Sequence, residues 1–210
     1  MKILHLNIIS RDAEPRFLMG YILQQAHPVI ANDGDSKIGT IFPDWNIETP
    51  GRCLAFYGKK AILNKILQQN YFKEMIDLNI LEAVIVEAPM GDFPKVRFIR
   101  NQKITGNTPN AIKRKVRRII SRQIQRGEID NESQYRPRLD QNLGDFPDTF
   151  YHILYLDSSS TQQNMPLCIQ LESINEGESK LCMERNTFDH YGFSSLSKHR
   201  GVVPMVSPFF

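Results

Sequence analysis

The sequence predicts an α+β protein made of two domains, residues 1–95 and residues 96–210. Three observations lead to this prediction. The first 95 residues alternate strand and helix patterns in an order typical of a ferredoxin-like (RRM-like) domain. The second part carries an arginine-rich helix among further strand patterns, which indicates a C-terminal α/β domain. With 210 residues and 41% hydrophobic content, the chain can bury one large core or two small ones.

Six segments of the first domain have a clear helix or strand pattern. Strands are predicted at residues 3–9, 37–42, 52–57 and 81–87, and helices at residues 14–26 and 60–78. We expect Pro28 to limit the first helix, because a proline disfavours helical dihedral angles in the residue before it. The second helix is expected to break near Asn70. The resulting order of strand, helix, strand, strand, helix, strand is the ferredoxin-like one.

The second domain is expected to begin with a strand at residues 95–101, followed by a helix at about 109–126. The polar stretch at residues 128–148 is predicted to be a loop, and strands follow at residues 150–157 and 167–172. Many RNA-binding proteins use a ferredoxin-like fold, but the RNP1 pattern of such domains is missing here. Any RNA is therefore expected to be held by other parts of the chain.

The predicted helix at 109–126 has its own start and stop signals and a basic face. Thr108 is a suitable N-cap, Pro109 suits the first turn, and Gly127 suits the position just past the end. At about 100° per residue its Ile and Val residues gather on one face. The basic side chains expected opposite this face or flanking it are Arg114, Lys115, Arg117, Arg118 and Arg122.

The charge of the chain is concentrated around this helix. Residues 96–128 hold ten Lys or Arg and one acid, a net charge of +9, whereas the whole chain has a net charge of +3. Solvated surface helices usually alternate charge signs for pairing between residues i and i+4, and this helix has no acid before Glu128. A phosphate backbone suits such a stripe, because each neutralised phosphate releases counterions. The helix therefore predicts a nucleic-acid partner.

Composition excludes several other classes. No apolar run approaches the roughly eighteen residues of a membrane span, and the N-terminus lacks a signal-peptide pattern, so we expect a cytoplasmic protein without a membrane partner. The three cysteines, Cys53, Cys168 and Cys182, are too widely spaced for a zinc site and are expected to be reduced thiols. No metal-ligand pattern is visible, and we expect neither a metal nor a cofactor.

Three short segments carry possible chemistry. His27 lies at the end of an amphipathic helix, where a histidine is more often structural than catalytic. The cluster Ser158-Ser-Ser-Thr161 follows a strand, where serines usually form turns. Residues 190–201 form a loop rich in Gly, Ser and basic residues that can present backbone amides to phosphate.

Together these pieces resemble the type I-F CRISPR-associated repeat-processing endoribonucleases, the Csy-four branch of the Cas-six family. The resemblance runs nearly end to end. It rests on Ala26-His27 followed by residues 36–44, on Arg100-Asn-Gln102, on Ser158-Ser-Ser-Thr161 and on Tyr191-Gly-Phe-Ser194.

The resemblance implies a metal-independent enzyme that binds the CRISPR repeat hairpin and cleaves pre-crRNA at the 3′ base of the stem. The substrate's own 2′-hydroxyl would attack the adjacent phosphate, leaving a 2′,3′-cyclic phosphate and a 5′-hydroxyl. It also implies that the protein stays on the crRNA 3′ handle among the other type I-F effector subunits. Target DNA would be met only through the assembled complex.

The resemblance also assigns roles to individual residues. His27 matches the general base, Ser158 and Ser160 match serines that position the attacking hydroxyl, and Tyr191 matches a tyrosine that orients the histidine. Arg100 and Gln102 match a pair that reads bases at the foot of the stem. The chain departs from relatives at two positions. Pro28 follows the candidate base, and Met165 stands where relatives place a phenylalanine that stacks on a base.

Two other classes of function remain open at this stage. A non-catalytic subunit that binds an RNA hairpin would carry the same basic helix and the same serines. A DNA-binding regulator would need a helix-turn-helix partner for the basic helix, and the strand and loop signals around that helix argue against one.

Overall fold

The computed structural model describes residues 1–34, 37–89, 94–102, 104, 109–135, 150–157, 164–174 and 187–206. Of residues 109–112, 157 and 164 only the backbone is described. The chain forms two compact units, one made of residues 1–101 and 150–210 and the other of residues 102–149. The domain boundary expected near residue 95 stays a prediction.

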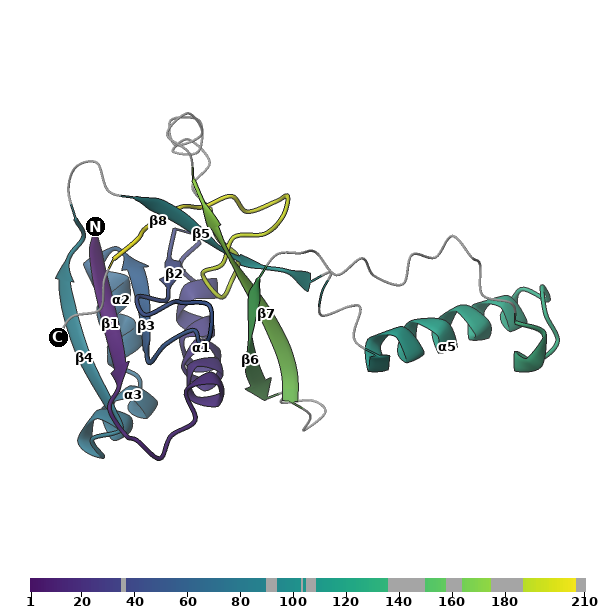
Figure 1. Ribbon diagram of the computed structural model, residues 1–210, viewed down its shortest axis with the longest axis horizontal. Helices are drawn as coiled ribbons and strands as arrows, with labels where there is room; N and C mark the ends of the chain where they lie inside the picture. Colours follow the sequence, from purple (N-terminus) through teal and green to yellow (C-terminus); the bar gives the residue numbers. More distant parts are fainter. Residues whose placement is uncertain are drawn as a thin grey trace. The chain divides into compact units, whose positions relative to one another are not determined.

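The first sheet of the larger unit is antiparallel and has the strand order β2-β3-β1-β4 (Figure 1). Its elements are β1 (Lys2–Ile8), α1 (Pro15–Ala31), β2 (Gly39–Ile41), β3 (Cys53–Gly58), α2 (Lys60–Leu67), α3 (Asn70–Asp77) and β4 (Leu81–Glu87). This succession is the predicted ferredoxin-like arrangement, with its second helix divided into α2 and α3. The α+β class and the break near Asn70 are confirmed.

The first helix continues past Pro28, so the expectation that Pro28 limits it is wrong. α1 runs to Ala31 with Pro28 inside it, and the cap residue Asn32 donates its backbone N–H to the carbonyl of Pro28 at 3.2 Å. A proline fixes its own φ close to the helical value and removes only one helical hydrogen bond. The last turn also buries Ile30, which is 3% exposed. Tertiary packing therefore overrides the local preference.

A second antiparallel sheet completes the larger unit, with the strand order β6-β7-β5-β8. Its strands are β5 (Lys95–Arg100), β6 (Tyr151–Asp157), β7 (Asn164–Ser173) and β8 (Val203–Pro204). β7 begins three residues before the predicted start. Its first three residues include an asparagine and a proline, which interrupt the apolar pattern that predicts a strand. β8 was not predicted, since two residues are too short to show a period.

The two sheets share one apolar core, with α1 packed against β6. Phe42 lies 5.1 Å from Phe98 and 6.1 Å from Phe193 between ring centroids, so aromatic rings join the two sheets and the C-terminal segment. Gly20 lets α1 approach β6 closely, because a Cβ there would lie within 2.7 Å of the Tyr155 carbonyl carbon. Both sheets therefore hold α1 in a fixed place.

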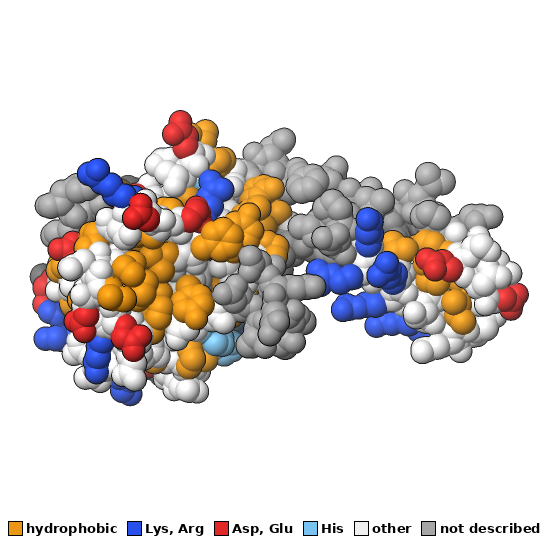
Figure 2. Space-filling view, turned by 90° about the horizontal axis from the view of Figure 1, so that it is seen from below, with side chains coloured by type: hydrophobic (Ala, Val, Ile, Leu, Met, Phe, Trp, Pro, Cys, Tyr) orange, Lys and Arg blue, Asp and Glu red, His pale blue; other side chains and the backbone are white. Residues whose placement is uncertain are grey.

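The smaller unit contains α5 (Pro109–Gln125) and the short helix η1 (Glu132–Gln134). α5 confirms the predicted arginine-rich helix. Its Lys and Arg side chains are exposed and gather on one side, while Ile120 is 6% exposed (Figure 2). In the described part of the chain, no helix is long and apolar enough to cross a membrane.

Candidate functional site

His27 lies near the C-terminal end of α1, next to the face that packs into the core. Its neighbour Ala26 is fully buried, and Ile30 on the following turn is nearly so. The His27 side chain is half-buried. Because α1 continues through Pro28, His27 belongs to regular helix and not to a frayed end.

Residues 189–194, called here the 189–194 turn, fold back tightly on themselves. The backbone N–H of Asp189 donates to the Phe193 carbonyl at 2.7 Å, and the N–H of Gly192 donates to the Asp189 carbonyl at 2.9 Å. Gly192 has a φ of 80°, a conformation that side chains with a Cβ rarely adopt. The glycine therefore allows the turn to close.

The 189–194 turn is fixed to both sheets of the larger unit. On β2, the N–H of Thr40 donates to the Gly192 carbonyl at 2.8 Å and its hydroxyl donates to the Tyr191 carbonyl at 2.7 Å. On β5, Ser194 takes part in two backbone hydrogen bonds of 2.9 Å each. A turn held by two strands presents its side chains in a defined position.

The turn brings four side chains of the larger unit into a row. The ring of Tyr191 stacks on His27, with centroids 4.4 Å apart and planes 23° apart. The guanidinium of Arg100 also lies over the Tyr191 ring, 5.3 Å from the ring centroid. Arg100 in turn pairs with Asp189, with Nη1 and Oδ2 3.6 Å apart. The predicted residues His27, Tyr191 and Arg100 therefore meet at one site.

A backbone carbonyl decides which nitrogen of His27 carries the proton. Nδ1 lies 2.9 Å from the carbonyl oxygen of His190. Since a carbonyl can only accept a hydrogen bond, Nδ1 must be the protonated nitrogen of the neutral ring. Nε2 then carries the lone pair, and no described group hydrogen-bonds to it. The ring is arranged to accept a proton at Nε2.

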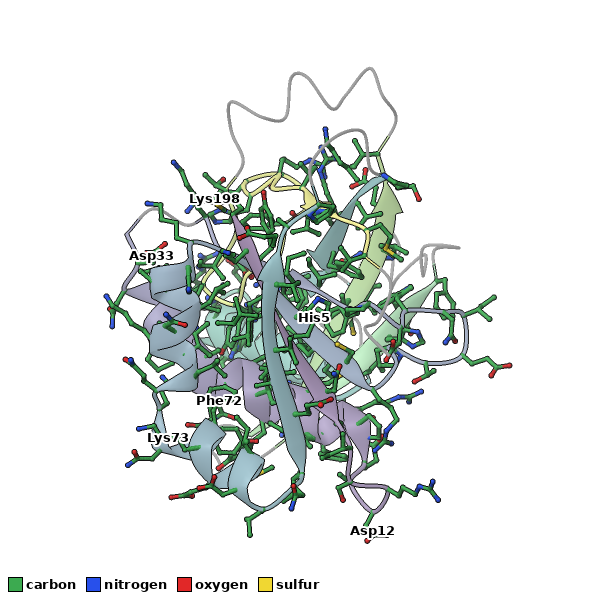
Figure 3. All side chains as sticks on the ribbon, turned by 90° about the vertical axis from the view of Figure 1, so that its left-hand side faces the viewer. His5, Asp12, Asp33, Phe72, Lys73 and Lys198 are labelled. Carbon is green, nitrogen blue, oxygen red and sulfur yellow. The ribbon has the colours of Figure 1, made fainter. Side chains whose placement is uncertain are left out.

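The other four histidines are placed differently. His5 lies on β1, fully buried, and burial lowers its pKa (Figure 3). His152 is 4% exposed, burial lowers its pKa, and its Nε2 bonds to the Asn46 carbonyl at 2.8 Å. The ring of His190 is exposed and lies 6.1 Å from that of His27, while His199 lies beyond the turn. Neither buried histidine can reach a substrate.

The structure places Met165 away from this site. Met165 is 39% exposed and pairs with Leu156 between β7 and β6. The residue before Leu156, Tyr155, stacks on Phe17 with centroids 4.6 Å apart. Phe17 precedes His27 by ten residues, which is about 15 Å along a helix. Met165 thus lies near the first turns of α1, and its expected contact with a base stays a prediction.

The remaining predicted residues are not tested by this geometry. Ser158 and Ser160 lie outside the described residues, so their roles stay predictions. Gln102 is exposed at the start of the smaller unit. Its expected partner Arg100 belongs to the larger unit. There Arg100 forms an ion pair with Asp189 and lies over the Tyr191 ring.

The basic side chains of α5 are available for an external partner. Arg114, Lys115, Arg117, Arg118 and Arg122 are all exposed. Among the described residues of this unit, Arg126 and Glu128 form an ion pair at the end of the helix, with Nη1 and Oε1 3.7 Å apart. The other basic side chains of α5 therefore remain available to an anionic partner.

Sequence reasoning missed two residues of the site, Asp189 and Thr40. Asp189 accepts hydrogen bonds from the backbone N–H groups of Tyr191 and Phe193, each at 2.9 Å. The signal that could have found it is the spacing of Asp189 and Gly192, since an acid three residues before a glycine is typical of a tight turn. Nothing in the sequence around Thr40 indicates its contact with the turn.

One comparison with known proteins agrees with the resemblance described above. A family model described as "CRISPR-associated protein (Cas_Csy4)" matches residues 5–205. A solved structure titled "CRISPR associated protein Cas6" is 9% identical, and the match covers 97% of this chain and 98% of that chain with a TM-score of 0.32. No curated protein matches.

Proposed function

This chain belongs to the CRISPR-associated Csy4 family, whose members are endoribonucleases that process CRISPR repeat RNA, and from that premise we propose a specific cleavage reaction. The protein binds the repeat hairpin and cuts pre-crRNA at the 3′ base of the stem. It needs no metal ion, because the nucleophile is the substrate's own 2′-hydroxyl. His27 is the general base.

One observation carries this proposal. The His190 carbonyl accepts the Nδ1 proton of His27, and Tyr191 covers one face of the ring, so the basic nitrogen is Nε2. The ring orientation is fixed before RNA arrives. A positioned base of this kind contributes about 10² to 10⁴-fold to a rate.

The reaction is a transesterification within the RNA. Nε2 of His27 removes the proton of the 2′-hydroxyl, and that oxygen bonds to the adjacent phosphorus. The bond from phosphorus to the 5′-oxygen breaks, this oxygen takes up a proton from water, and His27 returns its proton to the solvent. The products are a 2′,3′-cyclic phosphate and a 5′-hydroxyl. Ser158 and Ser160 are proposed to hold the 2′-hydroxyl.

Recognition of the hairpin is assigned to the basic helix and to Arg100 and Gln102. α5 enters the major groove at an end of the stem, where the groove of A-form RNA is open to side chains. Arg100 and Gln102 suit guanine and adenine, because each can form two hydrogen bonds to the base edge. The protein then remains on the 3′ handle in the cytoplasmic type I-F complex.

The first experiment measures cleavage of the repeat RNA of the protein's own locus in the presence of a chelator. The wild type is expected to release a 2′,3′-cyclic phosphate and a 5′-hydroxyl, identified by end labelling with and without phosphatase. His27→Ala should abolish cleavage and keep hairpin binding within about threefold, since a base contributes mainly to the rate. His199→Ala is the matched control and should cleave normally.

The same experiment separates the enzyme from a non-catalytic hairpin-binding subunit. Tight binding by the wild type without any cleavage would support the binding subunit and refute the reaction. Full cleavage by His27→Ala would move the role of base to another histidine, with His190 and His199 the next candidates.

The second experiment tests the basic helix through the salt dependence of binding. Arg118→Ala should lower the slope of log K against log salt by about 0.7 to 0.9, the value for one lost phosphate contact. Arg126→Ala is the control, because Arg126 already pairs with Glu128 at the helix end. Equal slopes for Arg118→Ala and the wild type would remove Arg118 from the RNA interface.

A further inference from the structure

Asp189 joins two parts of the candidate site that the proposed reaction uses separately. One carboxylate oxygen, Oδ1, accepts the backbone N–H groups of Tyr191 and Phe193 at 2.9 Å each. The other oxygen, Oδ2, lies 3.6 Å from Nη1 of Arg100. Both side chains are largely buried, with 17% exposure for Asp189 and 22% for Arg100.

The Oδ1 contacts determine the shape of the turn around His27. The N–H groups of Tyr191 and Phe193, which donate to Oδ1, flank the residue whose φ is 80°, so the acid accepts from donors that the tight turn would otherwise leave unpaired. Between Asp189 and these donors lies His190, whose carbonyl fixes the tautomer of His27. Without the acceptor the turn can relax, and both the carbonyl and the Tyr191 ring then leave the histidine.

The Oδ2 contact restrains the residue expected to read a base. Nη1 of Arg100 is paired with the Asp189 carboxylate, so a bidentate contact with guanine that uses Nη1 competes with this ion pair. The same guanidinium lies over the Tyr191 ring. Arg100 is therefore shared between RNA and the turn.

We propose that Asp189 is a positioning residue for the cleavage step, which holds the 189–194 turn against His27 and keeps Arg100 on Tyr191 until RNA takes Arg100 away. This inference rests on the proposed function. It predicts that loss of Asp189 slows cleavage through His27. It also predicts that the same loss leaves hairpin binding unchanged or makes it tighter through Arg100.

Two variants separate the roles of the two oxygens. Asp189→Asn keeps an oxygen that accepts from Tyr191 and Phe193 but removes the charge that holds Arg100. Asp189→Ala removes both. Asp12→Asn is the charge control, since Asp12 is exposed on the loop before α1 and lies outside the site (Figure 3).

The experiment measures single-turnover cleavage and the dissociation constant of the repeat hairpin for each variant. Asp189→Asn should cleave within about threefold of the wild type, whereas Asp189→Ala should be slower by about 10²-fold, the effect of misplacing a reacting group by about 1 Å. Both should bind as tightly as the wild type or up to about fivefold tighter, because a partly exposed ion pair is weak. Asp12→Asn should change neither quantity.

A measurement without RNA keeps the inference separate from the proposed function. Nitrogen chemical shifts of the His27 ring report which nitrogen is protonated, and the Nδ1–H form should dominate in the wild type and in Asp189→Asn but not in Asp189→Ala. If the alanine variant is unfolded by circular dichroism, Asp189→Ser takes its place, because the serine oxygen lies one bond closer to the backbone than Oδ1 and cannot occupy the position of Oδ1 between the two N–H groups.

Two results would overturn the inference. One is an Asp189→Ala protein with the wild-type rate and the wild-type ring signal. The other is an Asp189→Asn protein as slow as Asp189→Ala, or one that binds the hairpin more weakly than the wild type. A wild-type protein that does not cleave would instead refute the proposed function, while the ring signals would still test the role of Asp189 at His27.

Discussion

Replacing Gly192 by alanine should slow cleavage without reducing hairpin affinity. The added Cβ would lie 3.0 Å from the backbone nitrogen of Thr40 and 3.1 Å from the Ile38 carbonyl oxygen, and closer still to the Thr40 hydroxyl. Thr40 cannot rotate away freely, because its hydroxyl donates to the Tyr191 carbonyl. Restoring ordinary contacts of at least 3.4 Å moves the turn by up to about 1 Å, which can slow a reaction by about 10²-fold.

A matched glycine separates the steric effect from the backbone effect. Gly34 has a φ of 69°, close to the 80° of Gly192, but a Cβ there would meet nothing within 4 Å. Gly34→Ala should therefore lose only the roughly 1–2 kcal/mol that a left-handed conformation costs a residue with a Cβ. Gly192→Ala should lose more free energy of unfolding than Gly34→Ala.

The assay compares single-turnover rates, hairpin dissociation constants and thermal unfolding for the two alanine variants and the wild type. Only Gly192→Ala should lose rate, and neither variant should bind the hairpin more weakly, since α5 is unchanged. Equal cleavage by Gly192→Ala and the wild type would refute the link between the position of the turn and His27. Equal losses of rate in both variants would assign the effect to overall stability.

Three further outcomes follow from packing and protonation. Gly20→Ala should lower the unfolding temperature by several degrees, because the added Cβ collides with the backbone of Tyr155. Such overpacking costs about 1–3 kcal/mol, which exceeds the gain in helix propensity. A higher unfolding temperature would show that α1 can shift without loss of stability. Burial lowers the pKa of His5 and of His152, so the unfolded chain binds more protons than the folded protein below pH 6.5. Stability should therefore fall as the pH drops from 7 towards 5.5. His5→Gln should make this fall smaller, and an unchanged fall would contradict the role of His5. Burial, reinforced by Asp44, raises the pKa of the Cys53 thiol to about 12, so alkylation of native Cys53 at pH 8 should be far slower than after unfolding, and equal rates by mass spectrometry would disprove this.

Local patterns in the sequence were sufficient for the main elements of the fold. The alternation in β1 and β3 and the helical period of α5 are properties of neighbouring residues, and the structure has these elements within a few residues of the predicted bounds. The extension of α1 past Pro28 was not predictable in this way, because it depends on the burial of Ile30 in a core formed by distant strands. The same holds for β8, which exists only as a partner of β5.

The candidate site was predictable only in part. The family resemblance pointed to His27, Tyr191 and Arg100, but the features that orient His27 are a backbone carbonyl and a turn. The carbonyl of His190 lies 163 residues from His27 in the chain, and a carbonyl is present at every residue. Asp189 acts through backbone N–H groups as well, so its residue type alone did not single it out among the acids of the chain.

The distance in sequence between His27 and the 189–194 turn has a consequence during synthesis. A ribosome-bound chain exposes α1 and then α5 before the 189–194 turn has been made. Neither the His190 carbonyl nor the Tyr191 ring exists until residues 190 and 191 have been added. Under the proposed function, α5 is made before His27 can be oriented, and a fragment that ends before Asp189 is expected to bind the hairpin and leave it uncut.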